Sequence, residues 1–274
     1  MKKLIILLFL SIFVLSSCRE SDPVVLHKEK QSALEAFAPL PADFFPRHLT
    51  IVSAGDSLTE GIGDSTGQGG YLPYLKSMLE KSKGINEVDF LNYGVKGNRT
   101  TQLLKRLQST EMKLAIQKAD LVIITIGGND IMKVVRDNIS SLQINDFIEE
   151  KENYQEHLTQ IMDTVVQENP NASIVLVGLY NPFYKWFSDI QELDEIVEEW
   201  NVTGQTVIAN YSNAYFVEIE DLFEKSTEDL LYTDNFHPND KGYELIAGRL
   251  NKAMEEQVLP AIENKPFMVS TEGN

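Results

Sequence analysis

The apolar and polar positions of the chain follow two alternating periods from about residue 49 onward. Short runs of apolar, often β-branched residues predict strands, and stretches with apolar residues three or four positions apart predict helices. Because predicted strands and helices alternate, we expect a parallel sheet with helices on both faces, joined by right-handed crossovers. The predicted strands are residues 49–54, 88–93, 121–126, 173–177 and 215–219, and the predicted helices are residues 72–83, 100–118 in two pieces, 146–169, 189–210 and 240–256.

The N-terminus has the pattern of an export signal. Two lysines precede an apolar run over residues 4–15, and two serines follow it, which predicts a secretory signal peptide over residues 1–17. The next residue, Cys18, is the only cysteine, and residues 15–18 (LSSC) resemble a bacterial lipobox, in which the cysteine is lipidated. A plain signal peptide followed by an incidental cysteine is the alternative. We expect a lipoprotein that is exported and tethered to the outer face of the bacterial cell membrane, since two or more acyl chains anchor a protein stably.

Composition divides the remaining chain and limits its partners. Residues 18–46 contain several prolines and mixed charges and are interpreted as the lipidated cysteine and a tether. Residues 47–263 are interpreted as one α/β domain, and residues 264–274 as a C-terminal tail. The net charge of −17 argues against nucleic acid, whose phosphates require Lys and Arg contacts, and against electrostatic docking to anionic lipid.

The first predicted strand ends in Gly55-Asp56-Ser57, at the strand end where α/β proteins bind their ligands. Two interpretations of Ser57 are open at this point. As the N-cap of the next helix, Ser57 would form a capping box with Glu60. As a nucleophile, it would need a neighbouring base to accept its proton.

The ends of other predicted strands supply further polar groups. Two glycines lie in the loop after the second strand, Asn129 follows the third, and Asp234 and His237 follow the fifth. Taken singly, each has a simpler role in a turn. Together with Ser57 they are the parts of nucleophilic acyl transfer: a nucleophile, oxyanion donors, a general base and a carboxylate that orients it.

The blocks GDSLT, GGND and DNFH, with a glycine in the loop after the second strand, resemble the SGNH (GDSL) hydrolase superfamily over residues 48–256. The resemblance implies a three-layer α/β/α flavodoxin-like sandwich with a central parallel sheet of about five strands. It also implies hydrolysis of esters or thioesters. Carried over to this sequence, Ser57 is the nucleophile, His237 takes and returns its proton, and Asp234 orients the imidazole.

The resemblance also implies an oxyanion hole. Its donors would be the backbone N–H groups of Ser57 and Gly97 and the side-chain amide of Asn129. Gly97 is preferred to Gly94 because the glycine of the family lies late in this loop. The sequence contains no P-loop and no H-E-x-x-H motif, and its four histidines are scattered, so we expect no metal and no cofactor.

Apolar residues after the third, fourth and fifth strands favour a hydrophobic acyl group. We predict a carboxylic ester hydrolase of the lipase or acylhydrolase type, acting on small-molecule, lipid or glycan esters. The alternatives are a carbohydrate O-acetylesterase acting on cell-wall or extracellular glycans and an inert lipoprotein binding module. The residues predicted to contact the substrate, each with core packing as its alternative role, are Ile131, Met132, Tyr180, Phe183 and Tyr232.

Overall fold

The computed structural model of the protein describes residues 46–184 and 191–263. The predicted signal peptide, the lipidated Cys18, the tether up to residue 45 and the tail from residue 264 lie outside the described residues. Among the helices of the described ranges, none combines the length and the apolar character needed to cross a membrane.

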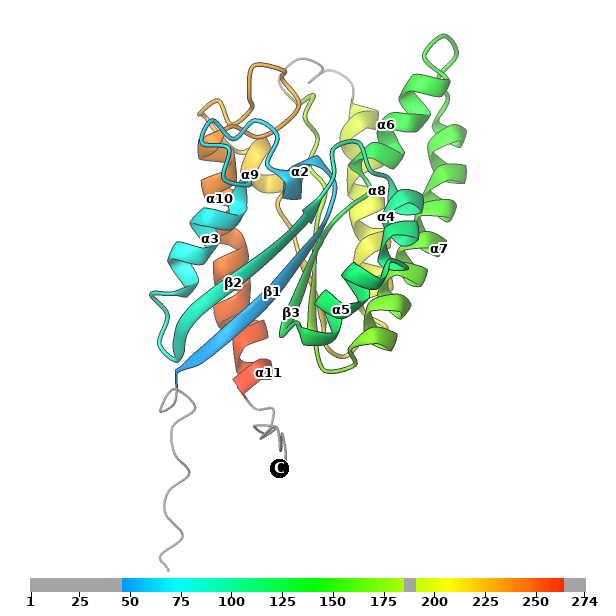
Figure 1. The fold of residues 1–274 in the computed structure, drawn as a ribbon. Helices are drawn as coiled ribbons and strands as arrows, with labels where there is room; N and C mark the ends of the chain where they lie inside the picture. The colour runs from blue at the N-terminus through cyan, green and yellow to red at the C-terminus, as the bar shows by residue number, and fades with distance from the viewer. Residues whose placement is uncertain (1–45, 185–190, 264–274) are drawn as a thin grey trace, which may run out of the picture. The chain divides into compact units, whose positions relative to one another are not determined.

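Five parallel strands form a single sheet in the order β2-β1-β3-β4-β5 (Figure 1). This is the flavodoxin-like order, in which the chain adds strands to opposite sides of β1 and leaves a crevice at the carboxyl ends of the strands. The predicted α/β fold with a central parallel sheet of five strands is confirmed. The strands are β1 (Arg47–Gly55), β2 (Ile85–Gly94), β3 (Leu121–Thr125), β4 (Ser173–Val177) and β5 (Ala214–Val217).

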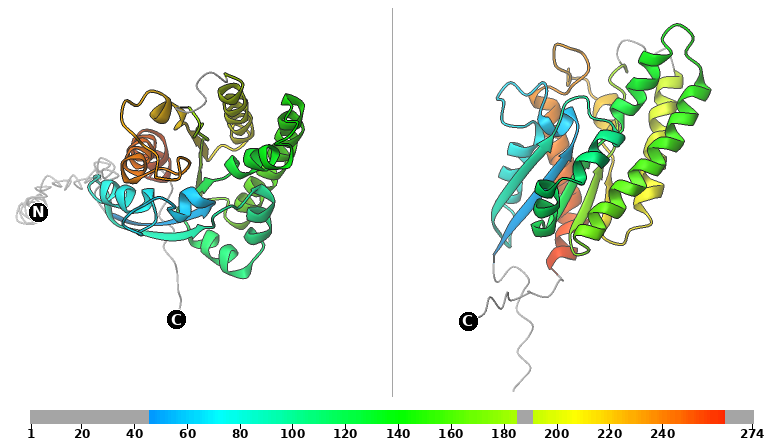
Figure 2. Two further views of the ribbon diagram at one scale, coloured as in Figure 1. Left: turned by 90° about the horizontal axis from the view of Figure 1, so that it is seen from above. Right: turned by 45° about the vertical axis from the view of Figure 1, so that its right-hand side comes forward.

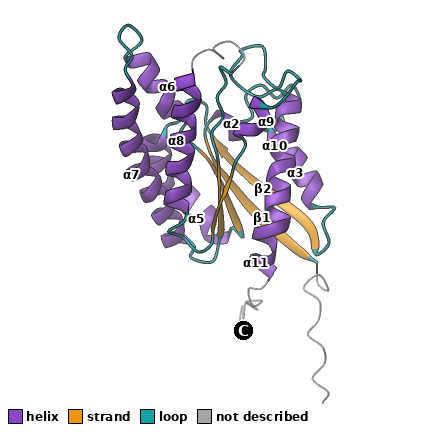
Figure 3. Ribbon diagram, turned by 180° about the vertical axis from the view of Figure 1, so that it is seen from behind, coloured by secondary structure: helices purple, strands orange, loops and turns teal. Residues whose placement is uncertain are grey.

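Helices cover both faces of the sheet over two separate apolar clusters (Figures 2 and 3). Successive strand residues point to opposite faces, so Ile51 and Ile123 join one cluster while Val52 and Val122 join the other. One face carries α3 (Tyr71–Leu79), α9 (Glu220–Glu224), α10 (Asp240–Ala253), the π-helix η1 (Met254–Val258) and α11 (Leu259–Glu263). The other carries α4 (Thr100–Leu107), α5 (Thr110–Lys118), α6 (Gly128–Asp137), α7 (Ile144–Glu168) and α8 (Gln191–Ile208).

Two helices are absent from the sequence prediction. The glycine pair before Asn129 predicts a turn, whereas helix α6 begins directly after Gly127. Gly127 has a φ of 120°, a backbone conformation that glycine adopts readily, and it redirects the chain from β3 into the helix. Helix α9 has only five residues, too few to show a period. The last helix also extends beyond its predicted end at residue 256, because η1 and α11 continue from α10 with Met254 and Val258 buried against the sheet.

Candidate active site

Ser57 is the first residue of α2 (Ser57–Glu60), the short helix that follows β1 at the carboxyl edge of the sheet. The N-cap of this helix is Asp56, whose Oδ1 accepts the N–H of Leu58 at 3.0 Å. Glu60 accepts the backbone N–H of Lys96 instead of turning back to the start of the helix. Of the two interpretations of Ser57, the capping box with Glu60 is therefore excluded, since the carboxylate one position earlier already satisfies the helix start.

The structure brings Ser57, His237 and Asp234 into one hydrogen-bonded row. Ser57 Oγ lies 2.9 Å from His237 Nε2 across 180 positions of sequence, and His237 Nδ1 lies 2.7 Å from Asp234 Oδ2. The second carboxylate oxygen, Asp234 Oδ1, accepts the backbone N–H groups of Phe236 and His237, each at 3.0 Å. Ser57 and His237 are buried, with 6% and 9% of their surfaces exposed. The serine hydroxyl thus faces a base whose far side is held by a carboxylate.

A tight loop presents His237 to the serine. The backbone N–H of Tyr232 donates to the carbonyl of His237 at 2.7 Å and closes this loop. Within it, Asn235 has a φ of 55°, the only positive φ at a residue other than glycine in the described part of the chain. Asparagine tolerates this left-handed conformation better than most residues, which allows Asp234 to fold back under the imidazole.

The carboxylate of Asp234 is kept ionised. Burial raises its pKa, but hydrogen bonds from the His237 side chain and from the backbone outweigh burial and hold the pKa below its usual value. An ionised carboxylate can only accept, so His237 Nδ1 carries the proton and Nε2 is left to accept from the Ser57 hydroxyl.

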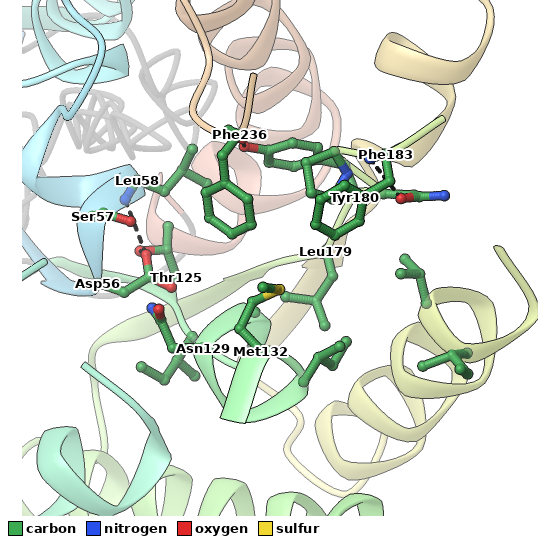
Figure 4. Close-up of a pocket in the computed structure, with 18 of the residues that line it drawn as sticks. Asp56, Ser57, Leu58, Thr125, Asn129, Met132, Leu179, Tyr180, Phe183 and Phe236 are labelled. Atoms are coloured by element: carbon green, nitrogen blue, oxygen red, sulfur yellow. Dashed lines mark hydrogen bonds between the residues drawn. The ribbon is translucent and has the colours of Figure 1, made fainter. Parts of the chain in front are cut away.

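Asn129 and the loop after β2 meet beside Ser57. Asn129 Nδ2 donates to the carbonyl of Asn98 at 3.1 Å, and its amide keeps a second N–H. Figure 4 shows Asn129 on the same side of the cavity as Ser57. Arg106 holds the loop in place, donating to the Tyr93 carbonyl at 2.7 Å and to Asn98 Oδ1 at 3.0 Å. The amide of Asn129 is therefore oriented by a clamped loop.

The two glycines singled out from the sequence are in different surroundings, since Gly94 is the last residue of β2 and Gly97 lies in the loop after it. The N–H of Gly94 donates to Asn92 Oδ1 at 2.8 Å, and a Cβ at Gly94 would lie 2.1 Å from the backbone nitrogen of Glu60. Gly94 is thus required for close packing against α2, and its donor is already used. Gly97 has a φ of 77°, and a Cβ there would meet no atom within 4 Å. The geometry favours Gly97 over Gly94 as a donor to a ligand.

A buried network of polar side chains joins the start of α2 to β3 and α3. Thr125 Oγ1 donates to Asp56 Oδ1 at 3.2 Å, and Thr59 Oγ1 lies 2.8 Å from Thr125 Oγ1 and 3.0 Å from the Tyr71 hydroxyl. Burial raises the pKa of Asp56 to about 7. Asp56 is a site residue that the sequence prediction missed, although its neighbours in the GDSL block were singled out.

A largely apolar cavity opens beside the row formed by Ser57, His237 and Asp234 (Figure 4). Ser57, His237 and Asn129 line it, so a molecule held there touches all of them. Four of the predicted substrate residues also line it: Ile131, Met132, Tyr180 and Phe183. Further apolar residues of the wall, which the prediction missed, come from α6, α7, α8 and the chain after β4 and include Val135, Phe147, Leu179, Leu193, Ile196 and Val197.

Tyr180 belongs to the cavity and to the core at once. Its ring stacks on Phe223 with centroids 4.0 Å apart, and its hydroxyl donates to the Phe236 carbonyl at 2.7 Å. Burial raises the pKa of this hydroxyl well above its usual value, so it remains a donor. Tyr180 thereby ties the loop that carries His237 to the cavity wall.

Tyr232 lies outside the cavity. Its side chain is not among the lining residues and is 42% exposed. The prediction rested on its proximity to Asp234 in sequence, but the turn that closes on His237 directs the two side chains differently. In the described ranges, no three His, Cys, Asp or Glu side chains are grouped closely enough to hold a metal ion.

The chain is similar in sequence to a known protein family and to two bacterial proteins. Residues 53–245 match the profile of the GDSL-like Lipase/Acylhydrolase family. The chain is 37% identical over 215 residues to the uncharacterized protein YpmR of Bacillus subtilis (strain 168), covering 78% of this chain and 84% of YpmR. It is 24% identical over 212 residues to the spore germination lipase LipC of Bacillus licheniformis, covering 75% of this chain and 96% of LipC.

The fold is similar to that of an enzyme of known structure. The crystal structure of the lipase Lip_vut3 from a goat rumen metagenome superposes with a TM-score of 0.68 at 22% identity. The match covers 75% of this chain and 97% of that lipase.

Proposed function

Because the chain belongs to the GDSL-like lipase/acylhydrolase family, we propose that it is a carboxylic ester hydrolase that forms an acyl-enzyme on Ser57. The observation that carries this proposal is the hydrogen-bonded row from Ser57 Oγ through His237 to Asp234, at 2.9 and 2.7 Å. A serine hydroxyl is a weak nucleophile until a base accepts its proton, and this row supplies that base in the required tautomer.

In the first half of the reaction, Ser57 Oγ attacks the ester carbonyl carbon while its proton passes to His237 Nε2. The carbonyl oxygen then carries the negative charge of a tetrahedral intermediate. As the intermediate collapses, His237 gives the proton to the departing alcohol oxygen, leaving the acyl group on Ser57. A water molecule repeats these steps, and the acid is released. Asp234 stays ionised throughout and stabilises the imidazolium.

The charge on the carbonyl oxygen would be stabilised by three N–H donors. We assign the backbone N–H groups of Ser57 and Gly97 and the free N–H of the Asn129 amide to this oxyanion hole. The clamp of Arg106 on the loop and the hydrogen bond of Asn129 to Asn98 support the assignment, since donors that are already oriented need no rearrangement during the reaction.

The walls of the cavity support a hydrophobic acyl group. From Ser57 to α8 they are formed mostly by aliphatic and aromatic side chains, such as Met132, Leu179 and Ile196. A carbohydrate O-acetylesterase needs little apolar volume beside its serine and a polar cleft for the sugar. We therefore place a lipase-like ester hydrolase first and the O-acetylesterase second.

The location of the enzyme is part of the proposal. The signal-like residues 1–17 and the lipobox-like residues 15–18 favour export and a lipid anchor on Cys18 at the outer face of the bacterial cell membrane. Metabolic labelling with a fatty acid analogue, compared between the native chain and Cys18→Ser, tests the anchor.

The enzyme assignment is tested with a fluorophosphonate probe, which labels activated serines. The native chain should be labelled, and Ser57→Ala should not. Ser65→Ala is a matched control, because Ser65 is an exposed serine bound to Asp240 away from the cavity, and this variant should retain the label. An unlabelled native chain would contradict the hydrolase proposal and favour an inert binding module.

A further inference from the structure

An aliphatic surface lies at the turn between α6 and α7, outside the cavity. Four side chains there are exposed to an unusual degree: Ile139 by 78%, Leu142 by 42%, Ile144 by 55% and Ile148 by 41%. We call this surface the aliphatic tip. Large aliphatic side chains exposed singly are normal, but a contiguous group of them on a domain marks an interaction site.

The turn of the aliphatic tip, between Asp137 and Asp146, carries no charge, whereas Ile148 lies beyond it next to the exposed Glu149. Residues 138–145 (NISSLQIN) contain no Asp, Glu, Lys or Arg, although 24% of the chain is charged. Aliphatic side chains gain free energy when they leave water, whereas a charged group would oppose transfer into an apolar medium. The composition of the turn thus suits entry into the apolar part of a lipid layer.

The backbone of the tip is ordered. The N–H of Ser141 donates to the Asn138 carbonyl at 2.8 Å, and the N–H of Gln143 donates to Asp146 Oδ2 at 3.1 Å at the start of α7. These bonds satisfy two backbone N–H groups of the turn that would otherwise need water.

A shallow groove beside the aliphatic tip shares wall residues with the acyl cavity. Ile144 and Ile148 line this groove on one side, and α8 contributes Ile196 and Trp200 together with Glu192, Glu195 and Glu199. Phe147 and Ile196 line both the groove and the cavity beside Ser57. The turn projects from the end of the domain at which the strands present their carboxyl ends (Figures 1 and 3). Helix α6, with Asn129 in its first turn, has ten residues and so spans about 15 Å between the site and the tip.

We propose that the aliphatic tip inserts into an electrically neutral lipid surface, so that esters enter the cavity directly from that surface. The net charge of −17 disfavours anionic lipid, which leaves zwitterionic or uncharged lipid as the partner. This proposal rests on the proposed function, because it assumes that the protein hydrolyses esters and adds that these esters lie in a lipid surface.

Insertion is measured with an environment-sensitive fluorophore. Cys18 is the only native cysteine, so the mature chain (residues 18–274) with Cys18→Ser and Ser140→Cys carries one label, at the tip. With phosphatidylcholine vesicles, the emission should shift to the blue and rise severalfold. A label at Lys83→Cys, an exposed position just before β2 at the opposite edge of the sheet, should not respond.

The effect on hydrolysis is measured with the double variant Ile139→Asp/Ile144→Asp. It should hydrolyse an ester embedded in phosphatidylcholine vesicles at least tenfold more slowly than the native chain. Its kcat/KM for a soluble short-chain ester should stay within twofold. Leu114→Asp is the matched control, because Leu114 is a 52% exposed leucine on α5, and this variant should behave as the native chain on both substrates.

Three results would overturn the proposal. The first is a tip label that does not respond to neutral vesicles. The second is equal loss of vesicle and soluble hydrolysis in the double variant. The third is self-association of the native chain in sedimentation that the double variant abolishes, which would assign the tip to a second copy. If the native chain does not hydrolyse the soluble ester at all, the proposed function is contradicted. Failure of the tip proposal and failure of the proposed function can therefore be told apart.

Discussion

The polar and apolar halves of the site are built in different ways. The polar half comes from short segments directly after β1 and β3 and from the loop between α9 and α10, and its groups are fixed by hydrogen bonds, as in the row from Ser57 to Asp234. The apolar half comes from single residues spread over α6, α7, α8 and the chain after β4, and it is held mainly by packing. The reaction thus depends on a few polar groups, none of which has a substitute, whereas many apolar side chains contribute to binding the acyl group. Substitutions should have large effects in the first half and graded effects in the second.

The largest effect is expected at Asp234. Asp234→Asn keeps the shape of the side chain but removes the charge that holds the His237 tautomer, so kcat/KM for a soluble ester should fall by about 10⁴-fold. The melting temperature should change little, because the side chain of Asp234 is largely at the surface, 38% exposed. Steady-state kinetics and thermal unfolding monitored by circular dichroism measure the two quantities.

Asp89→Asn is the control for this prediction. Asp89 Oδ2 lies 2.9 Å from His48 Nε2, a similar pair at an exposed place remote from the cavity. This variant should keep full activity. A loss of less than about tenfold in Asp234→Asn would remove Asp234 from the reaction, since even a modest general-base contribution exceeds that figure.

The next effect is expected at Asn129. Asn129→Ala removes one proposed oxyanion donor and should lower kcat by about 10² to 10³-fold with KM little changed, because the bond forms fully only in the transition state. Asn210→Ala is a matched control: Asn210 is exposed, two residues after α8, and its amide also donates to a carbonyl, that of Thr206 at 3.0 Å. Near-native turnover in a folded Asn129→Ala chain would remove Asn129 from the oxyanion hole.

The same contrast explains what the sequence could predict. The strand pattern and the blocks around Ser57, Asn129 and His237 predict the sheet and bring these residues to one edge, because the motifs are short and local. The cap could not be assigned from sequence because aspartate and serine are both good caps, and only the backbone geometry decides between Asp56 and Ser57. The cavity walls on α7 and α8 could not be identified, since a side chain that lines a cavity has the same apolar pattern as one that fills the core.

A smaller, pH-dependent effect is expected at Asp56. Its pKa is about 7 in the folded chain and 3.8 ordinarily, so the folded state binds the proton more tightly, and this group costs stability as the pH rises from about 4 through 7. Asp56→Asn cannot ionise and can still cap α2. Relative to the native chain, its free energy of unfolding should rise by about 1 to 3 kcal/mol between pH 5 and pH 8.

Urea unfolding at the two pH values measures this difference. Glu220, whose pKa burial also raises to about 7, is present in both chains and cancels in the comparison. A difference that does not change with pH would mean that Asp56 is ionised in the folded protein over this whole range.

The smallest effect is expected in the apolar half, at Leu179. Its backbone N–H and carbonyl are both held by Asn201, at 2.7 and 3.0 Å, which fixes the position from which its side chain lines the cavity. Leu179→Trp fills volume that a long acyl chain would occupy, and kcat/KM for an octanoate ester should fall at least about tenfold while that for an acetate ester stays within about twofold. Leu114→Trp, on the exposed face of α5, is the control and should leave the ratio unchanged. An equal loss on both esters would mean that the variant disturbs Ser57 rather than the acyl group, and no loss on either ester would place the acyl chain outside this cavity.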